Sequence, residues 1–243
     1  MYRKLLFSFV LFLLFWQSAS AQRPFMQLLK ADSLFETKKY TQSFEIYKNI
    51  LETSEQFSPR MLLRMAFIKE GLGDYTSALY YLNLFYSFNS DKEVLKKMEE
   101  IASRYKLSGY NYSDLEYFIS LYNEYYYYII TFFLMTAVSF YLYMIIKKTS
   151  NSKLGVSPLL FMIILSAAYY LTNYSLTPPK GILTNAHTPL MSSPSGGANL
   201  IDFVEKGHRV TLLGKEDIWY KILWNDEPAY VRDINLVLIE SSL

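Results

Sequence analysis

The sequence predicts a multidomain membrane protein in which an all-α helical repeat and a small all-β barrel flank a hairpin of two transmembrane helices. Three observations lead to this prediction: an N-terminal export pattern, two long uncharged segments in the middle of the chain, and short alternating strands near its end. Hydrophobic residues make up 51% of the 243 residues and aromatic residues 18%, which is high for a soluble protein. We therefore expect part of this apolar surplus to lie in lipid.

Charge and cysteine content exclude several classes of protein. The chain has 24 Lys and Arg against 22 Asp and Glu, so it carries no electrostatic footprint for nucleic acid. It has no cysteine, which excludes a disulfide framework, a thiolate metal site and a thiol nucleophile. A chain without thiols also fits export into an oxidising compartment.

Residues 1–21 have the pattern of a cleaved export signal. Arg3 and Lys4 precede an apolar run from Leu5 to Trp16, and the small residues up to Ala21 form a cleavage site. We expect cleavage after Ala21. The alternative is an uncleaved anchor, but the run is shorter than the roughly 20 residues that span a bilayer.

Residues 22–124 are predicted to form helical repeats. The sequence matches itself at an offset of 35, a period typical of helix-turn-helix repeats. The matching positions are Ala31, Tyr40, Ser43, Tyr47 and Ile50 with Ala66, Tyr75, Ala78, Leu82 and Phe85. The stretch from Leu72 to Leu82, with its Gly-Asp-Tyr turn and its small Ala78, resembles the tetratricopeptide (TPR) family; the first unit has Lys38 where Gly is common.

The TPR resemblance implies a concave face that holds a peptide or a partner helix. The residues it would place on this face are Asp32, Phe35, Glu36, Leu63, Phe67 and Glu70. The alternative is that the apolar members belong to the core and the acids are solvated.

Two further helices are predicted to close the repeat. Ser90 with Glu93 has the pattern of a capping box. An apolar stripe follows it: Val94, Leu95, Met98, Ile101, Ala102 and Tyr105. A second stripe runs directly into the first membrane segment: Leu115, Phe118, Ile119 and Tyr122.

Residues 125–146 and 157–176 are predicted transmembrane helices, so the bilayer itself is an expected partner. The loop of residues 147–156 contains Lys147, Lys148 and Lys153 and no acid, which favours the cytoplasmic side. Both flanking domains are then periplasmic. This topology agrees with the export signal.

Residues 180–243 are predicted to form the barrel. We expect strands near Gly181 to Asn185, Leu200 to Val204, Arg209 to Gly214, Trp219 to Trp224 and Ala229 to Val231. The segments Pro189 to Pro194, Phe203 to Gly207, Val210 to Gly214, Trp219 to Ile222 and Ala229 to Val231 together resemble the bacterial SH3 (SH3b) family. Alternation puts Tyr220 and Ile222 on one face of their strand and Trp219 on the other, either in a ligand groove or in a packing role.

No pattern for catalysis, metal binding or a cofactor is present in the sequence. His187 and His208 have no metal-ligand spacing and are predicted to be solvated surface histidines. We therefore expect a protein that is not an enzyme and needs no cofactor.

The order of these parts resembles the BatE-like proteins of bacterial aerotolerance operons. That resemblance implies partners among membrane-bound von Willebrand-type Bat proteins and a MoxR-type ATPase. It favours a non-enzymatic scaffold of the bacterial inner membrane that presents both modules to the periplasm for protein-protein interaction. The alternative is a cell-wall sensor whose SH3-like domain binds peptidoglycan and whose repeats relay to a partner.

Overall fold

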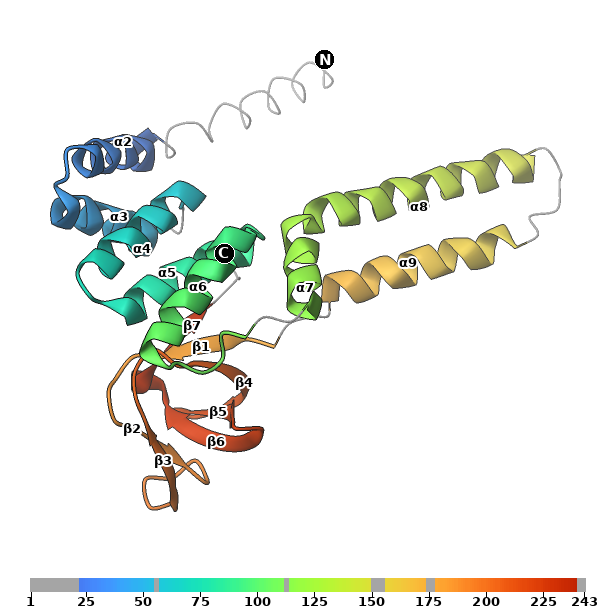
Figure 1. The fold of residues 1–243 in the computed structure, drawn as a ribbon. Coiled ribbons are helices and arrows are strands. Elements are labelled where there is room, and N and C mark those ends of the chain that lie inside the picture. The colour runs from blue at the N-terminus through green and yellow to red at the C-terminus, as the bar shows by residue number, and fades with distance from the viewer. Residues whose placement is uncertain (1–21, 55–56, 112–113, 150–155, 174–177, 240–243) are drawn as a thin grey trace, which may run out of the picture. The chain divides into compact units, whose positions relative to one another are not determined.

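A computed structural model of the chain describes residues 22–54, 57–111, 114–149, 156–173 and 178–239. The predicted export signal with Ala21 lies outside these residues, as do Lys153 and the end of the predicted second span. In the described residues, eight α-helices precede a seven-stranded antiparallel sheet, so the chain is of mixed α and β class (Figure 1). The chain divides into two compact units, one ending at Leu82 and the other beginning at Asn83. This boundary falls before residue 124, where the predicted repeat domain ends.

Two helix pairs make up the N-terminal part of the chain. The helices are α2 (Gln22–Glu36), α3 (Tyr40–Ser54), α4 (Pro59–Gly71) and α5 (Tyr75–Phe88), of which α5 crosses the unit boundary. The two turns have the same backbone geometry, since Lys38 and Gly73 both have positive φ, at 61° and 75°. Their N–H groups donate to Phe35 and Glu70 carbonyls, each over 2.9 Å. The period of 35 is thus present in the backbone, and Lys38 adopts the turn where glycine is common.

The aligned small residues are buried, as the repeat pattern predicts. Ala31, Ser43, Ala66 and Ala78 all lie in the interior. Ser43 Oγ donates a hydrogen bond of 2.8 Å to the Ala31 carbonyl oxygen, which ties α3 to α2 at their crossing. A small side chain is needed there because the two backbones approach closely.

Helix α6 (Lys92–Tyr105) is the first described helix that lies wholly in the second unit, and its cap differs from the prediction. Asp91 caps it, accepting the Glu93 N–H over 2.8 Å, so the Ser90 capping box is wrong. A carboxylate at this position also interacts favourably with the helix dipole. The apolar stripe from Val94 to Ala102 is buried, but Tyr105 is exposed because the helix ends there.

Helix α7 (Asp114–Glu124) differs from the prediction in the residues that it buries. Leu115 and Phe118 are exposed, whereas Ser120 is buried and shares a hydrogen bond of 2.8 Å with the Tyr86 hydroxyl. The predicted stripe is thus only partly covered, since its other members, Ile119 and Tyr122, are half-buried. Polar contacts help to set the orientation of this helix.

Helices α8 (Tyr126–Thr149) and α9 (Ser157–Asn173) run side by side in opposite directions (Figure 1). The Tyr141 and Phe161 rings meet between them at 6.2 Å. One described helix, Tyr126–Lys147, is long and apolar enough to cross a membrane, whereas α9 has 17 residues and falls short of that length. The structure is thus compatible with membrane association through one helix.

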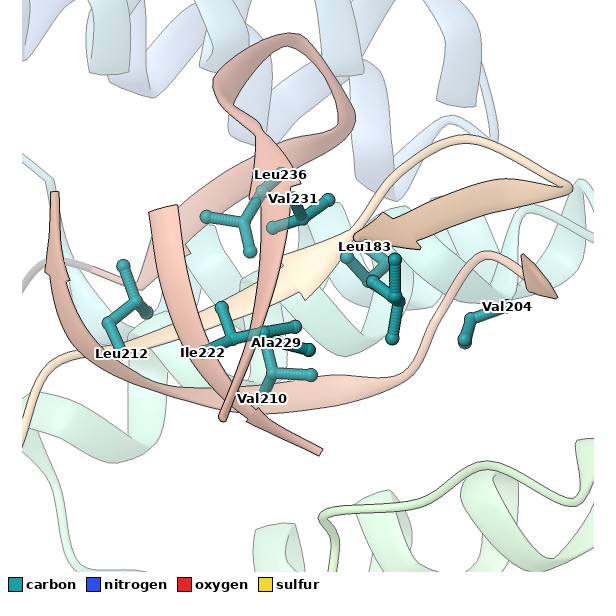
Figure 2. Packing of buried hydrophobic residues seen from close by; sticks show 9 residues of the cluster. Leu183, Val204, Val210, Leu212, Ile222, Ala229, Val231 and Leu236 are labelled. Atoms are coloured by element: carbon teal, nitrogen blue, oxygen red, sulfur yellow. The ribbon is translucent and has the colours of Figure 1, made fainter. Parts of the chain in front are cut away.

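The sheet has the strand order β3-β2-β6-β5-β4-β1-β7. Its strands are β1 (Lys180–Leu183), β2 (Thr188–Met191), β3 (Leu200–Val204), β4 (Arg209–Glu216), β5 (Trp219–Trp224), β6 (Glu227–Arg232) and β7 (Leu236–Ile239). The short strands β2 and β7 were absent from the predicted set. One buried cluster takes residues from all seven strands, including Val204 of β3 and Leu236 of β7 (Figure 2). Because these are the two edge strands, the sheet must curve around its core.

Candidate functional site

A buried arginine joins the first helices of the two repeats. Arg64 of α4 lies 2.7 Å from Asp32 Oδ1 of α2, and it also forms an ion pair with Glu36. Its Nη1 donates to the Tyr47 hydroxyl over 3.1 Å, and Tyr47 donates in turn to Asp32 over 2.5 Å. We call these four residues the Arg64 cluster. Charged contacts thus hold α2 against α4.

The electrostatics of the Arg64 cluster keep it charged. Burial disfavours the cation, but the Tyr47 hydrogen bond and the attraction of Asp32 and Glu36 outweigh it and raise the pKa of Arg64. Burial, together with the hydrogen bond to Asp32, raises the pKa of Tyr47, so its hydroxyl stays protonated. Tyr47 therefore acts as a neutral bridge between a cation and an anion.

Three aromatic rings lie beside the Arg64 cluster. Phe35, Tyr40 and Phe67 contact one another edge to face, with centroids 5.3 to 5.8 Å apart. The Arg64 guanidinium lies 4.6 Å from the Phe35 centroid. Phe67 is 54% exposed, and Leu63 is also exposed on α4. The outcome is an apolar surface with a buried cation beneath it.

The structure brings together three of the residues predicted to bind a partner, Asp32, Phe35 and Phe67. Leu63 lies on the same helix as Phe67, and Glu70 lies near the end of α4, where its carbonyl accepts the turn hydrogen bond. The alternative to a binding face, in which the apolar members belong to the core and the acids are solvated, does not fit Asp32 or Phe67. Asp32 is paired and Phe67 is exposed.

Sequence reasoning missed Arg64, Tyr47 and Tyr40. A signal for Arg64 existed: it is the one charge in the run from Met61 to Ile68, and Asp32 and Glu36 are spaced four residues apart on the facing helix.

A second polar contact ties the sheet to the segment before α7, within the second unit. Arg209 of β4 is buried, and its Nε donates to the Gly109 carbonyl over 2.6 Å while its backbone N–H donates to Ser108 over 3.1 Å. Tyr110 donates its hydroxyl to the Gly207 carbonyl over 2.8 Å. We call this contact between residues 108–110 and 207–209 the junction. It joins segments about a hundred residues apart in sequence.

Charged groups extend the junction to α5, α7 and β1. Arg209 Nη1 donates to Asn83 Oδ1 over 3.2 Å and Nη2 lies 3.6 Å from Glu116. Lys180 Nζ lies 2.7 Å from Glu116. Burial and the nearby Arg209 lower the pKa of Lys180, against the attraction of Glu116. Glu116 is thus the anion that holds two cations of the sheet.

His208 is not the solvated histidine that the sequence predicts. Its Nδ1 accepts the Ser108 N–H over 3.0 Å, and its ring meets Trp224 edge to face at 5.3 Å. Burial lowers the pKa of His208, although Glu205 and Asp202 oppose this effect. His187 is exposed as predicted, 2.9 Å from a Glu205 carboxylate oxygen.

Trp219, the remaining candidate, is the first residue of β5 and pairs with Arg232. It is 8% exposed, although Tyr220, its neighbour, is the one that packs against the sheet core. Such low exposure favours the packing role over an open groove.

Within the described residues, no three His, Cys, Asp or Glu side chains are grouped to hold a metal ion. Comparisons with protein-family models, curated proteins and solved structures find no match. The TPR, bacterial SH3 and BatE-like resemblances therefore stay predictions. So do the expectations that the protein is not an enzyme and needs no cofactor.

Proposed function

We propose that this chain is a non-enzymatic scaffold of the bacterial inner membrane that presents two binding modules on one side of the bilayer. One observation carries the proposal. Along α8 most apolar side chains outside the contact with α9 are exposed, among them Phe132, Val138 and Ile146. A helix that is apolar all round needs an apolar environment, which lipid supplies.

The proposed anchor is a hairpin in which α9 also crosses the bilayer. At about 1.5 Å per residue the 17 residues of α9 reach about 26 Å, somewhat less than the bilayer core. Local thinning accommodates a short span at modest cost. The lysines of the 147–156 loop support a cytoplasmic loop and two periplasmic modules.

The proposed first module is the TPR-like repeat, and its binding surface is the one around the Arg64 cluster. Phe67 and Leu63 offer exposed apolar area, while Glu36 adds an exposed acid next to them. A partner segment that combines an apolar anchor with a basic side chain fits this surface. An exposed aromatic residue is the kind of side chain that contributes most to binding.

The proposed second module is the SH3-like sheet. The resemblance to BatE-like proteins implies that its partners are von Willebrand-type Bat proteins in the same membrane. That assignment rests on the resemblance. Peptidoglycan is the competing ligand, and binding of the purified full chain to isolated cell wall distinguishes the two.

Site-specific photocrosslinking in native membranes tests the proposal. A photoreactive residue at Leu63 should give a discrete crosslinked partner, and Phe67→Ala should reduce that product at least tenfold, since hot-spot truncations cost about 2 kcal/mol or more. A photoreactive residue at Lys48 of α3, also solvent-exposed, is the matched control and should give no such product. Equal crosslinking from both positions would contradict a binding surface at the Arg64 cluster.

A further inference from the structure

The junction contains a titratable group at a position where its protonation state decides whether a hydrogen bond exists. His208 Nδ1 accepts the Ser108 N–H over 3.0 Å, so this nitrogen must carry no proton. In imidazolium both ring nitrogens are donors, and Nδ1–H would then face another N–H. The bond is available only to the neutral ring.

The neighbouring contacts make that bond part of a larger unit. The next residue, Arg209, donates its backbone N–H to the Ser108 carbonyl, and the previous one, Gly207, accepts from Tyr110. All three residues of the 207–209 segment thus bond residues 108–110. The steric fit is equally close, because a Cβ on Gly109 would lie 2.0 Å from the Arg209 oxygen. Because the two segments are packed this closely, they cannot move apart locally to accommodate a proton on His208 Nδ1.

We propose that His208 makes the junction a pH-sensitive latch, closed while the ring is neutral and released when it is protonated. Release separates the sheet from the segment that leads through α7 into α8. The latch goes beyond the scaffold role and does not depend on what either module binds.

The charges around His208 act in both directions. Asp202 and Glu205, from β3 and the loop after it, favour protonation. Arg209 and Lys180, with Glu116 between them, make up the rest of the charged junction. Trp224 covers the ring from β5 and contributes to the burial that disfavours the cation.

The sign of the pH dependence follows from the lowered pKa of His208. A group whose folded-state pKa is depressed stabilises the docked state above its ordinary value, about 6.5 for histidine. That stabilisation is lost as the pH falls through the folded-state pKa. Between pH 6.5 and the folded-state pKa, protonation of this one group shifts the equilibrium between the docked and released states by at most about tenfold per pH unit.

Hydrogen exchange of the full chain in detergent micelles tests the latch. After correction for intrinsic rates, the segment containing Ser108 and Tyr110 should lose protection severalfold or more between pH 7.5 and pH 5. His208→Asn should keep its protection at pH 5, because the amide oxygen takes the place of Nδ1 and does not titrate. In His208→Lys the ammonium group has no acceptor for the Ser108 N–H, so this variant should already lack the protection at pH 7.5.

Two controls make the result decisive. The chain has 2 histidines, and His187→Asn should behave like the wild type. Fluorescence of Trp224 should report the same transition in the wild type and should not do so in His208→Asn. Unchanged wild-type protection between the two pH values, or loss of protection in His208→Asn at pH 5, would overturn the latch, and neither result depends on whether His208→Lys folds.

Discussion

Gly109 approaches Arg209 so closely that a Cβ atom on Gly109 would lie 2.0 Å from the Arg209 carbonyl oxygen. Gly109 also has a φ of +89°, in the region that favours glycine. Two independent constraints therefore require glycine at this position, and both belong to the junction.

Gly109→Ala should destabilise the second unit by about 2 to 4 kcal/mol, the sum of backbone strain and steric displacement. Gly73→Ala is the matched control, since Gly73 has a φ of +75° but has nothing within 4 Å of its Cβ position. Gly73→Ala should lower the free energy of unfolding only by the backbone strain, about 1 to 2 kcal/mol. Chemical denaturation of the full chain measures both, and equal losses would mean that the close approach to Arg209 does not matter.

Arg64→Met should destabilise the first unit by about 3 kcal/mol, because it leaves Asp32 and Tyr47 without their buried cation. Arg60→Met on the same helix is the control. Arg60 is 70% exposed and lies 3.4 Å from Glu36, and such surface pairs contribute less than about 1 kcal/mol. If thermal melts gave the two variants the same stability, Arg64 would not organise this surface.

Ala78→Leu should cost about 1 to 3 kcal/mol, because it adds volume at a fully buried helix crossing. Ala78→Ser places at this position the residue that the first repeat has at Ser43, and it should be nearly neutral. A melting temperature unchanged by leucine, or lowered equally by serine, would refute the repeat register.

Trp219→Ala should unfold or strongly destabilise the sheet, with a loss of about 3 to 5 kcal/mol, because the side chain is buried. Tyr220→Ala removes a half-buried ring that packs on the core and should cost less. Circular dichroism melts of both variants, together with a binding assay, distinguish a packing role of Trp219 from a role in a ligand groove. A folded Trp219→Ala that has lost its ligand would restore the groove interpretation.

Local and periodic features were predictable from the sequence. The offset of 35 predicts the helix pairs and the buried Ala31, Ser43, Ala66 and Ala78, because a helix crossing needs small residues wherever the repeat recurs. Alternation likewise predicts that Ile222 faces the core and that Tyr220 shares its side. Both follow from regular spacing along the chain, at a period of 35 residues for the helix pairs and of two residues for the strand.

Contacts between distant segments were not predictable. Arg209 meets Gly109 across 100 residues, and no local pattern marks either as a partner of the other. The same limit explains the error at His208, because no local pattern marks its contacts with Ser108 and Trp224. On α7 the predicted apolar stripe is exposed at Leu115 and Phe118, since polar contacts of Ser120 and Glu116 help to orient the helix.

The most direct test of the membrane-anchored scaffold is accessibility labelling of the cysteine-free chain. Single cysteines at Ser33 and Ser195, both exposed, and at Ser150 in the predicted cytoplasmic loop are treated with a membrane-impermeant maleimide in intact spheroplasts. Ser33→Cys and Ser195→Cys should label at once, and Ser150→Cys only after the membrane is permeabilised. Labelling of Ser150→Cys in intact spheroplasts, or protection of Ser195→Cys while Ser33→Cys reacts, would contradict a hairpin that holds both modules on one side.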